Sequence, residues 1–284
     1  MSKREDQMKQ YLDELVKKAN VPAFINDDPV QFPKRFKDKR DIEIAALLTS
    51  YITRGKREQT IKSCEKIFGP EFMGVKPYEY VMSDSTWEKI DPEKANDSLH
   101  LCCYVSDFIY LCRGLRKWYD SSKNGSLEAF FYDKKPQPDT IWKGIKKLRE
   151  HFSDANKDTE SKNVSSFLSA TSAAKRIHLM LRWLCRDDGI VDLGIWKNIK
   201  PSELMIPLDS HVGDAARDLG LITQKTETRN AVIALTEKLR EFDPKDPIKY
   251  DFALFAHNLI QRCPICLRLR EAHGLEKLIQ MAKA

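Results

Sequence analysis

The sequence predicts an all-α fold, and three observations support that prediction. Apolar residues recur at helical spacing along most of the 284 residues. No segment shows the sustained alternation that marks β-strands bounded by tight turns. Charged residues make up 32% of the chain and apolar residues 42%, which is the balance of a folded globular protein rather than a disordered one. Neither a fixed repeat nor a low-complexity stretch interrupts the pattern.

The first half of the chain contains three clear helical segments. Residues 5–19 place their apolar side chains on one stripe, as in an amphipathic helix. Residues 41–52 are apolar on nearly every side after the first turn, which predicts a helix buried in a core. Gly55 ends this segment. A further helix is predicted to reach Phe68 and Gly69, where glycine suits the left-handed position after a helix.

The later helices are separated by polar or proline-containing connections. Long helices are predicted at residues 104–119, from an N-cap at Asp139 to Phe152, at 227–241 and at 248–262. A separate short helix is predicted to end near Tyr132. Residues 153–163 are polar and irregular, which indicates an exposed loop. The chain is long enough for two lobes, at roughly 150 residues per domain, and the lobes need not follow sequence order.

The charge distribution permits nucleic-acid binding without establishing it. The formal net charge is +6, and five of the seven residues 34–40 are basic. A second basic cluster lies at 54–57. Each cluster is interpreted with equal weight as a solvated surface or as part of a DNA contact. No run approaches the roughly 18 apolar residues of a membrane span, and no apolar segment follows the basic N-terminus, so we expect a cytoplasmic protein without a membrane partner.

The cysteines and acidic residues do not predict a metal site. Seven cysteines, an odd number, are scattered through apolar segments, as is typical of reduced core residues. Only Cys263 and Cys266 have metal-like spacing, but two thiolates cannot complete a tetrahedral zinc or an iron–sulfur site. Asp187, Asp188 and Asp192 fit a turn better than a metal site. We therefore expect no metal and no cofactor.

Two residues, Lys175 and Asp209, suggest chemistry. Lys175 lies near the start of a predicted helix, and Asp209 opens another helix 34 residues further along. A desolvated lysine can attack a sugar carbon next to a leaving base, while an aspartate takes its proton or stabilises the developing positive sugar. Each residue also has a simpler interpretation, because aspartate is a common N-cap and lysine a common surface charge. The pair favours excision of a base from DNA as the leading hypothesis.

The surroundings of this pair resemble the helix-hairpin-helix DNA glycosylase superfamily. Residues 207–221 are similar to its aspartate segment, which has an aspartate, a small hydroxyl residue and a histidine at a helix start and a leucine-glycine at its end. Residues 41–57 look like the first buried helix and the loop after it, and residues 250–257 like the late helix beneath the aspartate. The resemblance spans roughly residues 40–266 and is closest to a bacterial branch of the superfamily.

The resemblance implies a two-lobed helical fold with DNA in a basic cleft. Residues 40–199 would form a helical-bundle lobe with Lys175, and residues 1–39 with 200–284 a second lobe with Asp209. Lys175 lies at the position of the family's Schiff-base lysine, and Asp209 lies at the position of its catalytic aspartate. The number of residues between them is similar to that in the archaeal 8-oxoguanine glycosylase branch. The implied activity is that of a monomeric base-excision glycosylase with AP-lyase activity, which removes an oxidised purine such as 8-oxoguanine from damaged duplex DNA.

The resemblance also implies a set of DNA contacts and shows two departures. The expected contacts are Arg54, Lys56, Arg57, Ser172, Arg176 and His211. His211 has a second interpretation as a partly buried residue that completes a helix cap. The hairpin from Ser169 to Ala174 lacks the glycines whose N–H groups contact phosphate in the family, and Ile206 replaces a glycine of many members. The glycine-free hairpin favours the alternative of a non-catalytic DNA- or RNA-binding protein that keeps the fold.

Four aromatic residues near these segments have two interpretations. They are Trp183, Trp196, Phe252 and Phe255. They could stack on an extruded base, but aromatic residues at helical spacing more often belong to a core. The absence of a four-cysteine cluster excludes the iron–sulfur domain of endonuclease III and leaves the glycosylase hypothesis in place.

Overall fold

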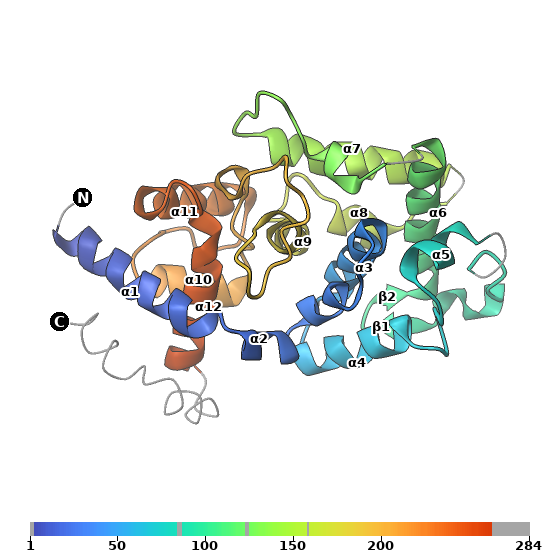
Figure 1. The fold of residues 1–284 in the computed structure, drawn as a ribbon, viewed down its shortest axis with the longest axis horizontal. Coiled ribbons are helices and arrows are strands. Elements are labelled where there is room, and N and C mark those ends of the chain that lie inside the picture. The colour runs from blue at the N-terminus through green and yellow to red at the C-terminus, as the bar shows by residue number, and fades with distance from the viewer. Residues whose placement is uncertain (1–2, 84–86, 123–124, 158, 263–284) are drawn as a thin grey trace.

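Helices dominate the computed structural model, which describes residues 3–83, 87–122, 125–157 and 159–262, and the prediction of a mostly helical protein is confirmed. The helices are α1 (Lys3–Ala19), α2 (Pro22–Asn26), α3 (Lys39–Ile52), α4 (Arg57–Phe68), α5 (Pro77–Met82), α6 (Val105–Ser121), α7 (Thr140–Ala155), α8 (Lys162–Phe167), α9 (Lys175–Cys185), α10 (Ser210–Asp218), α11 (Arg229–Phe242) and α12 (Tyr250–Arg262). Two strands, β1 (Ser98–His100) and β2 (Cys103–Tyr104), lie before α6 (Figure 1). Within these ranges the helices are too short or too polar to span a bilayer.

Two of the long helices, α3 and α11, begin at a residue whose side chain caps them. The helices predicted at 41–52 and 227–241 correspond to α3 and α11. Each is preceded by a side chain that accepts a backbone N–H from the first turn, Asp38 for α3 and Thr228 for α11. Asp139 occupies the predicted N-cap position of α7, although its side chain makes no cap hydrogen bond.

Short elements depart from the prediction. Strands β1 and β2 form an antiparallel ribbon, whereas the sequence predicted no strand. Strands of three and two residues are too short for alternation to stand out. Leu101, between them, has a φ of 51°, in the left-handed region. The loop predicted at 153–163 is also shorter than expected, because α7 continues to Ala155 and α8 begins at Lys162.

Helix α3 lies in the core, since every residue from Asp41 to Ile52 is buried. This burial confirms the expectation for a segment that is apolar on nearly every side. Helix α3 contacts α5, α6 and α9, whereas α12 contacts α1 and α10. Figure 1 shows α9 in the middle, between the elements around α3 and those around α12. The 3₁₀ turns η1 (Pro29–Gln31) and η2 (Pro33–Arg35), which precede the predicted lobe boundary at residue 40, contact α3.

The cysteines in the described ranges are free thiols. Four of them are buried, as the sequence predicted: Cys64, Cys103, Cys112 and Cys185. Burial raises the pKa of the Cys112 thiol well above its usual value, so it remains protonated at neutral pH. Cys102 is half-buried. The spacing of Cys263 and Cys266 lies outside the residues that the structure describes.

Candidate active site at two helix starts

The fold brings Lys175 and Asp209 together. Lys175 is the first residue of α9, Asp209 is the N-cap of α10, and Lys175 Nζ lies 3.3 Å from Asp209 Oδ2. The other carboxylate oxygen, Oδ1, accepts the backbone N–H of Val212 at 3.0 Å. Asp209 therefore caps its helix and faces the lysine at the same time. Both side chains remain partly exposed, 27% for Lys175 and 33% for Asp209, so a ligand can reach them.

A hairpin between α8 and α9 presents Lys175. Ala174, immediately before the lysine, has φ 45° and ψ 34°, the left-handed conformation that glycine adopts most easily. The hydroxyl of Ser172 accepts the N–H of Ala174 and donates to the carbonyl of Ser169, both at 3.1 Å. The hairpin thus makes its tight turn without glycine, with a serine hydroxyl supporting the backbone.

The hairpin is fastened to the start of α11. Ser172 forms an isolated antiparallel β-bridge with Thr228. The next residue, Arg229, donates from Nη1 to the carbonyl of Ala170 at 3.2 Å. These contacts join two segments that are far apart in sequence, and they fix the turn from which Lys175 projects.

A third charged residue, Asp251 in the first turn of α12, interacts electrostatically with the pair. Its carboxylate accepts a hydrogen bond from Arg182 Nη1. Burial raises the pKa of Asp251, the Arg182 charge opposes that shift, and the negative charge of Asp209 adds to it. Lys175 also acts on Asp251 electrostatically, so the lysine and both carboxylates share one electrostatic site. Helix α12 contacts α10, and this packing brings Asp251 near the Asp209 cap.

The sequence analysis gave Asp251 no role, although a signal for it was present. Arg182 follows Lys175 by seven residues, which is two helical turns, so both side chains lie on one face of α9. A buried arginine on that face requires a carboxylate partner. The identity of the partner depends on the packing of α12, which no local pattern encodes.

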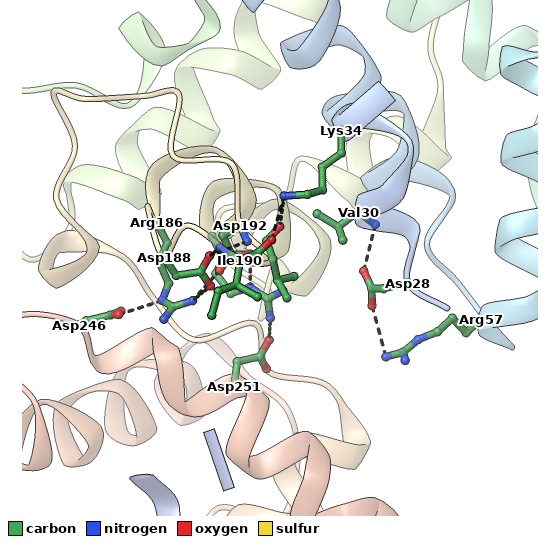
Figure 2. Close-up of polar contacts among 12 residues, drawn as sticks. Asp28, Val30, Lys34, Arg57, Arg186, Asp188, Ile190, Asp192, Asp246 and Asp251 are labelled. Atoms are coloured by element: carbon green, nitrogen blue, oxygen red, sulfur yellow. Dashed lines mark hydrogen bonds and ion pairs between the residues drawn. The ribbon is translucent and has the colours of Figure 1, made fainter. Parts of the chain in front are cut away.

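A buried network of arginines and aspartates continues along α9 (Figure 2). Arg182 Nε lies 3.2 Å from Asp192 Oδ1. Arg186 contacts Asp192 at 3.0 Å and Asp246 at 2.8 Å, and it also pairs with Asp188 at 2.5 Å. The network joins α9, the loop after it and the segment that leads into α12.

The acidic residues of this loop serve as a turn and as arginine partners. Asp188 Oδ1 accepts the N–H groups of Ile190 at 2.8 Å and Asp192 at 3.1 Å, which confirms the predicted turn. Asp187 is paired with Lys197 at 2.6 Å. In the described part of the chain, no group of three or more His, Cys, Asp or Glu side chains is arranged to hold a metal ion.

His178, one turn after Lys175, is excluded as an acid or base near neutral pH. It is 1% exposed, and its ring meets the Trp142 ring edge-on with centroids 4.8 Å apart. Neither ring nitrogen has a hydrogen-bond partner among the described residues. Burial lowers the pKa of His178 from 6.5 to about 3, so the imidazole remains neutral.

The low pKa of His178 predicts acid sensitivity. An unfolded histidine binds a proton below about pH 6.5, whereas folded His178 does not until about pH 3, so the contribution to stability falls as the pH drops through 6.5. At about pH 5 the expected cost is about 2 kcal/mol. Urea unfolding at about pH 7.5 and 5 should show this additional loss in the wild type relative to His178→Leu. Equal losses in both proteins would contradict it.

Three of the predicted DNA-contact residues are exposed: Lys56, Ser172 and His211. Lys56 is the N-cap of α4, and His211 is the second residue of α10, beside Asp209. The interpretation of His211 as a partly buried residue is wrong, because the residue is exposed. All three are accessible to a phosphate.

Two of the predicted contact arginines, Arg54 and Arg176, donate to uncharged groups of the protein, and the third, Arg57, pairs with Asp28. Arg54 Nη1 lies 2.6 Å from Cys102 Sγ. Arg176 donates from Nη1 to the carbonyl of Tyr51, and burial lowers the pKa of its guanidinium to about 10. Both residues are half-buried, so a direct contact with DNA would need their side chains to leave these partners.

Three of the four aromatic residues with two interpretations are buried: Trp183, Trp196 and Phe252. Trp196 Nε1 donates to Glu43 at 2.7 Å, which fixes that ring inside the protein. The core interpretation is therefore confirmed for these three. Phe255 is half-buried, and the guanidinium of Arg57 lies 4.4 Å from its ring centre. Arg57 also pairs with Asp28 at 3.4 Å (Figure 2).

The fold and the site define a mostly helical protein with a lysine–carboxylate pair at two neighbouring helix starts. Residues 28–260, which include Lys175, Asp209 and Asp251, match the family described as "Protein of unknown function (DUF2400)". The chain belongs to this family. No curated protein and no solved structure matches it.

Proposed function

We propose that the protein is a DNA glycosylase with AP-lyase activity, of the two-lobed helix-hairpin-helix type, which acts as a monomer on damaged duplex DNA. Its substrate would be an oxidised purine such as 8-oxoguanine. The observation that carries this proposal is the 3.3 Å separation of Lys175 Nζ and Asp209 Oδ2 at the starts of α9 and α10. Both groups are accessible, and they supply the nucleophile and the carboxylate that base excision requires.

The proposed reaction assigns one role to each residue. Lys175 Nζ attacks the sugar C1′, the C1′–N bond breaks, and the base leaves with the bonding electrons. A lysine must be neutral to attack, and Asp209 Oδ2 is close enough to receive its proton. In the alternative role of this carboxylate, Asp209 stays ionised and its charge stabilises the positive sugar as the base departs. The sugar ring then opens: the C1′–O4′ bond breaks, O4′ takes a proton, and C1′ and Nζ form a protonated imine. Loss of a C2′ proton from this imine permits elimination of the 3′ phosphate.

The position of Lys175 is not explained by stability. A positive side chain in the first turn of a helix faces the positive end of the helix dipole, which disfavours it by about 0.3–1 kcal/mol. A partly exposed ion pair stabilises the folded state by about 0–1 kcal/mol. Since the two effects nearly cancel, the lysine contributes little to the stability of the fold at this position. This supports a chemical role.

The alternative is a non-catalytic DNA- or RNA-binding protein with the same fold. The glycine-free hairpin favours it, because Ala174 carries a methyl group where close approach of the backbone to phosphate would be needed. Such a protein would need only its basic surface and would retain DNA binding without reaction.

The test of the proposed function is borohydride trapping on labelled duplexes. The duplexes carry an abasic site or an oxidised guanine, with an undamaged duplex of the same sequence as the control. A covalent band that depends on the lesion supports an imine-forming enzyme. Binding without a band on either substrate would sink the lyase mechanism and favour a monofunctional glycosylase or the binding protein.

Lys56 is expected to contribute to DNA affinity through a phosphate contact. It is exposed in a basic loop, and no salt bridge joins it to an acidic side chain in the described ranges. Lys56→Ala should weaken binding to all duplexes similarly and reduce the slope of log affinity against log salt by about 1. Lys146→Ala on α7, where Lys146 is paired with Glu150, is the matched control. An unchanged slope would mean that the loop is only a solvated surface.

A further inference from the structure

Asp251 is a second carboxylate of the candidate site, and its burial distinguishes it from Asp209. We propose that Asp251 is a positioning residue that acts through Lys175: its charge, held in place by Arg182, keeps Nζ at the site and stabilises the positive nitrogen of the imine. This inference rests on the proposed glycosylase function, because the imine exists only in that reaction. It adds to that function a carboxylate that does not touch the substrate.

The geometry around Arg182 makes Asp251 rigid. The Arg182 side chain is 3% exposed and lies between two carboxylates, Asp192 on Nε and Asp251 on Nη1. The Phe252 ring centre lies 4.3 Å from the guanidinium carbon, which closes the site from another side. A guanidinium held at both ends leaves Asp251 one orientation. Because Arg182 and Lys175 share a face of α9, that orientation is fixed relative to the lysine.

The charge of the network supports a role beyond pairing. Two arginines, Arg182 and Arg186, face four carboxylates: Asp188, Asp192, Asp246 and Asp251. Figure 2 shows Lys34 reaching the same loop, where it donates to the carbonyls of Ile190 and Val191. Buried ion pairs contribute little net stability because desolvation opposes the attraction. The two arginines and the carboxylates Asp192 and Asp251 are buried, whereas Asp188 and Asp246 are partly exposed. The buried pairing of Asp251 is therefore poorly explained by stability.

Asp251 interacts electrostatically with the reacting nitrogen of Lys175. The groups that interact with Asp251 come from two elements: Arg182 and Lys175 on α9, and Asp209 at the start of α10. In the proposed reaction the positive charge of the lysine reappears on Nζ as the protonated imine. Fixed charges in a low-dielectric interior act strongly and need no reorganisation during the reaction. A buried carboxylate therefore stabilises the intermediate throughout its lifetime.

The test compares Asp251→Asn with Asp246→Asn. Both substitutions remove an arginine-paired carboxylate of the same network and keep the side-chain shape. Asp251 is coupled to Lys175, whereas Asp246 pairs with Arg186, which lies four residues further from Lys175 along the chain than Arg182. Single-turnover trapping on abasic duplex, duplex affinity and urea unfolding are measured for each. We expect Asp251→Asn to slow trapping about tenfold, with affinity within about twofold of wild type, and Asp246→Asn to trap at close to the wild-type rate.

The outcomes separate the two proposals. Wild-type trapping with an unaffected Asp251→Asn rate, or equal slowing in both variants, would overturn the role of Asp251 alone. No trapping by the wild type would remove the lyase reaction and this inference together. If Asp251→Asn does not fold, the double variant Arg182→Gln/Asp251→Asn removes both charges of the pair, and a wild-type trapping rate in that protein overturns the inference.

Discussion

Replacing Lys175 by alanine is expected to abolish the covalent band that borohydride produces between the wild-type protein and an abasic duplex. The imine can form only on a primary amine, and at the candidate site the fold places the amine of Lys175 3.3 Å from the Asp209 carboxylate. Duplex affinity should stay within about threefold of the wild-type value, since a single positive charge near the phosphates contributes only a part of the electrostatic binding. Band intensity and equilibrium binding, measured on the same duplex, check the two expectations.

Lys175→Arg provides the sharper control. Arginine keeps the positive charge and can still pair with Asp209, but its guanidinium does not form an imine. This variant should therefore bind like the wild type and trap nothing. A band that persists in Lys175→Ala would place the nucleophile on another amine. Loss of binding in Lys175→Ala that Lys175→Arg restores would mean that Lys175 acts as a charge rather than as a nucleophile.

The sequence predicted the parts of the site that depend on local rules. Asp209 could be recognised because an N-cap is set by the residues that follow it, and its side chain does accept the N–H of Val212. Helix α3 could be recognised because its apolar pattern has no polar face. The predicted pairing of Lys175 with Asp209 went further, since it rested on the chemistry of an amine and a carboxylate at two helix starts and on the resemblance, and the structure does bring the two side chains together.

The rest depended on tertiary packing. Arg176 was predicted to contact DNA, yet its guanidinium donates to the Tyr51 carbonyl on α3, a partner 125 residues away in sequence. Asp251 was seen only as part of a helix, because its coupling to the lysine arises from the packing of α12 on α10. A side chain at a given helical position can face solvent or a partner helix, and only the three-dimensional arrangement decides between them.

Asp209→Asn is expected to reduce excision of an oxidised base by about 10²–10⁴-fold while leaving the fold intact. The two carboxylate oxygens have separate tasks, since Oδ1 accepts from Val212 and Oδ2 faces Lys175. Asparagine caps helices about as well as aspartate, so the cap on α10 survives the substitution. What is lost is the negative charge beside Nζ. Single-turnover release of the base and thermal unfolding measure the two effects separately.

Asp209→Ala completes the comparison, because alanine removes the cap as well as the charge. It should lower the free energy of unfolding by about 1 kcal/mol relative to Asp209→Asn and be no more active. If Asp209→Asn excised the base at the wild-type rate and only Asp209→Ala were impaired, capping would account for the aspartate entirely. Asp209 would then not be the proton acceptor for Lys175, and the result would favour the alternative of a non-catalytic binding protein. If both variants lose the reaction and only the alanine variant loses stability, the carboxylate serves chemistry and the cap serves the fold.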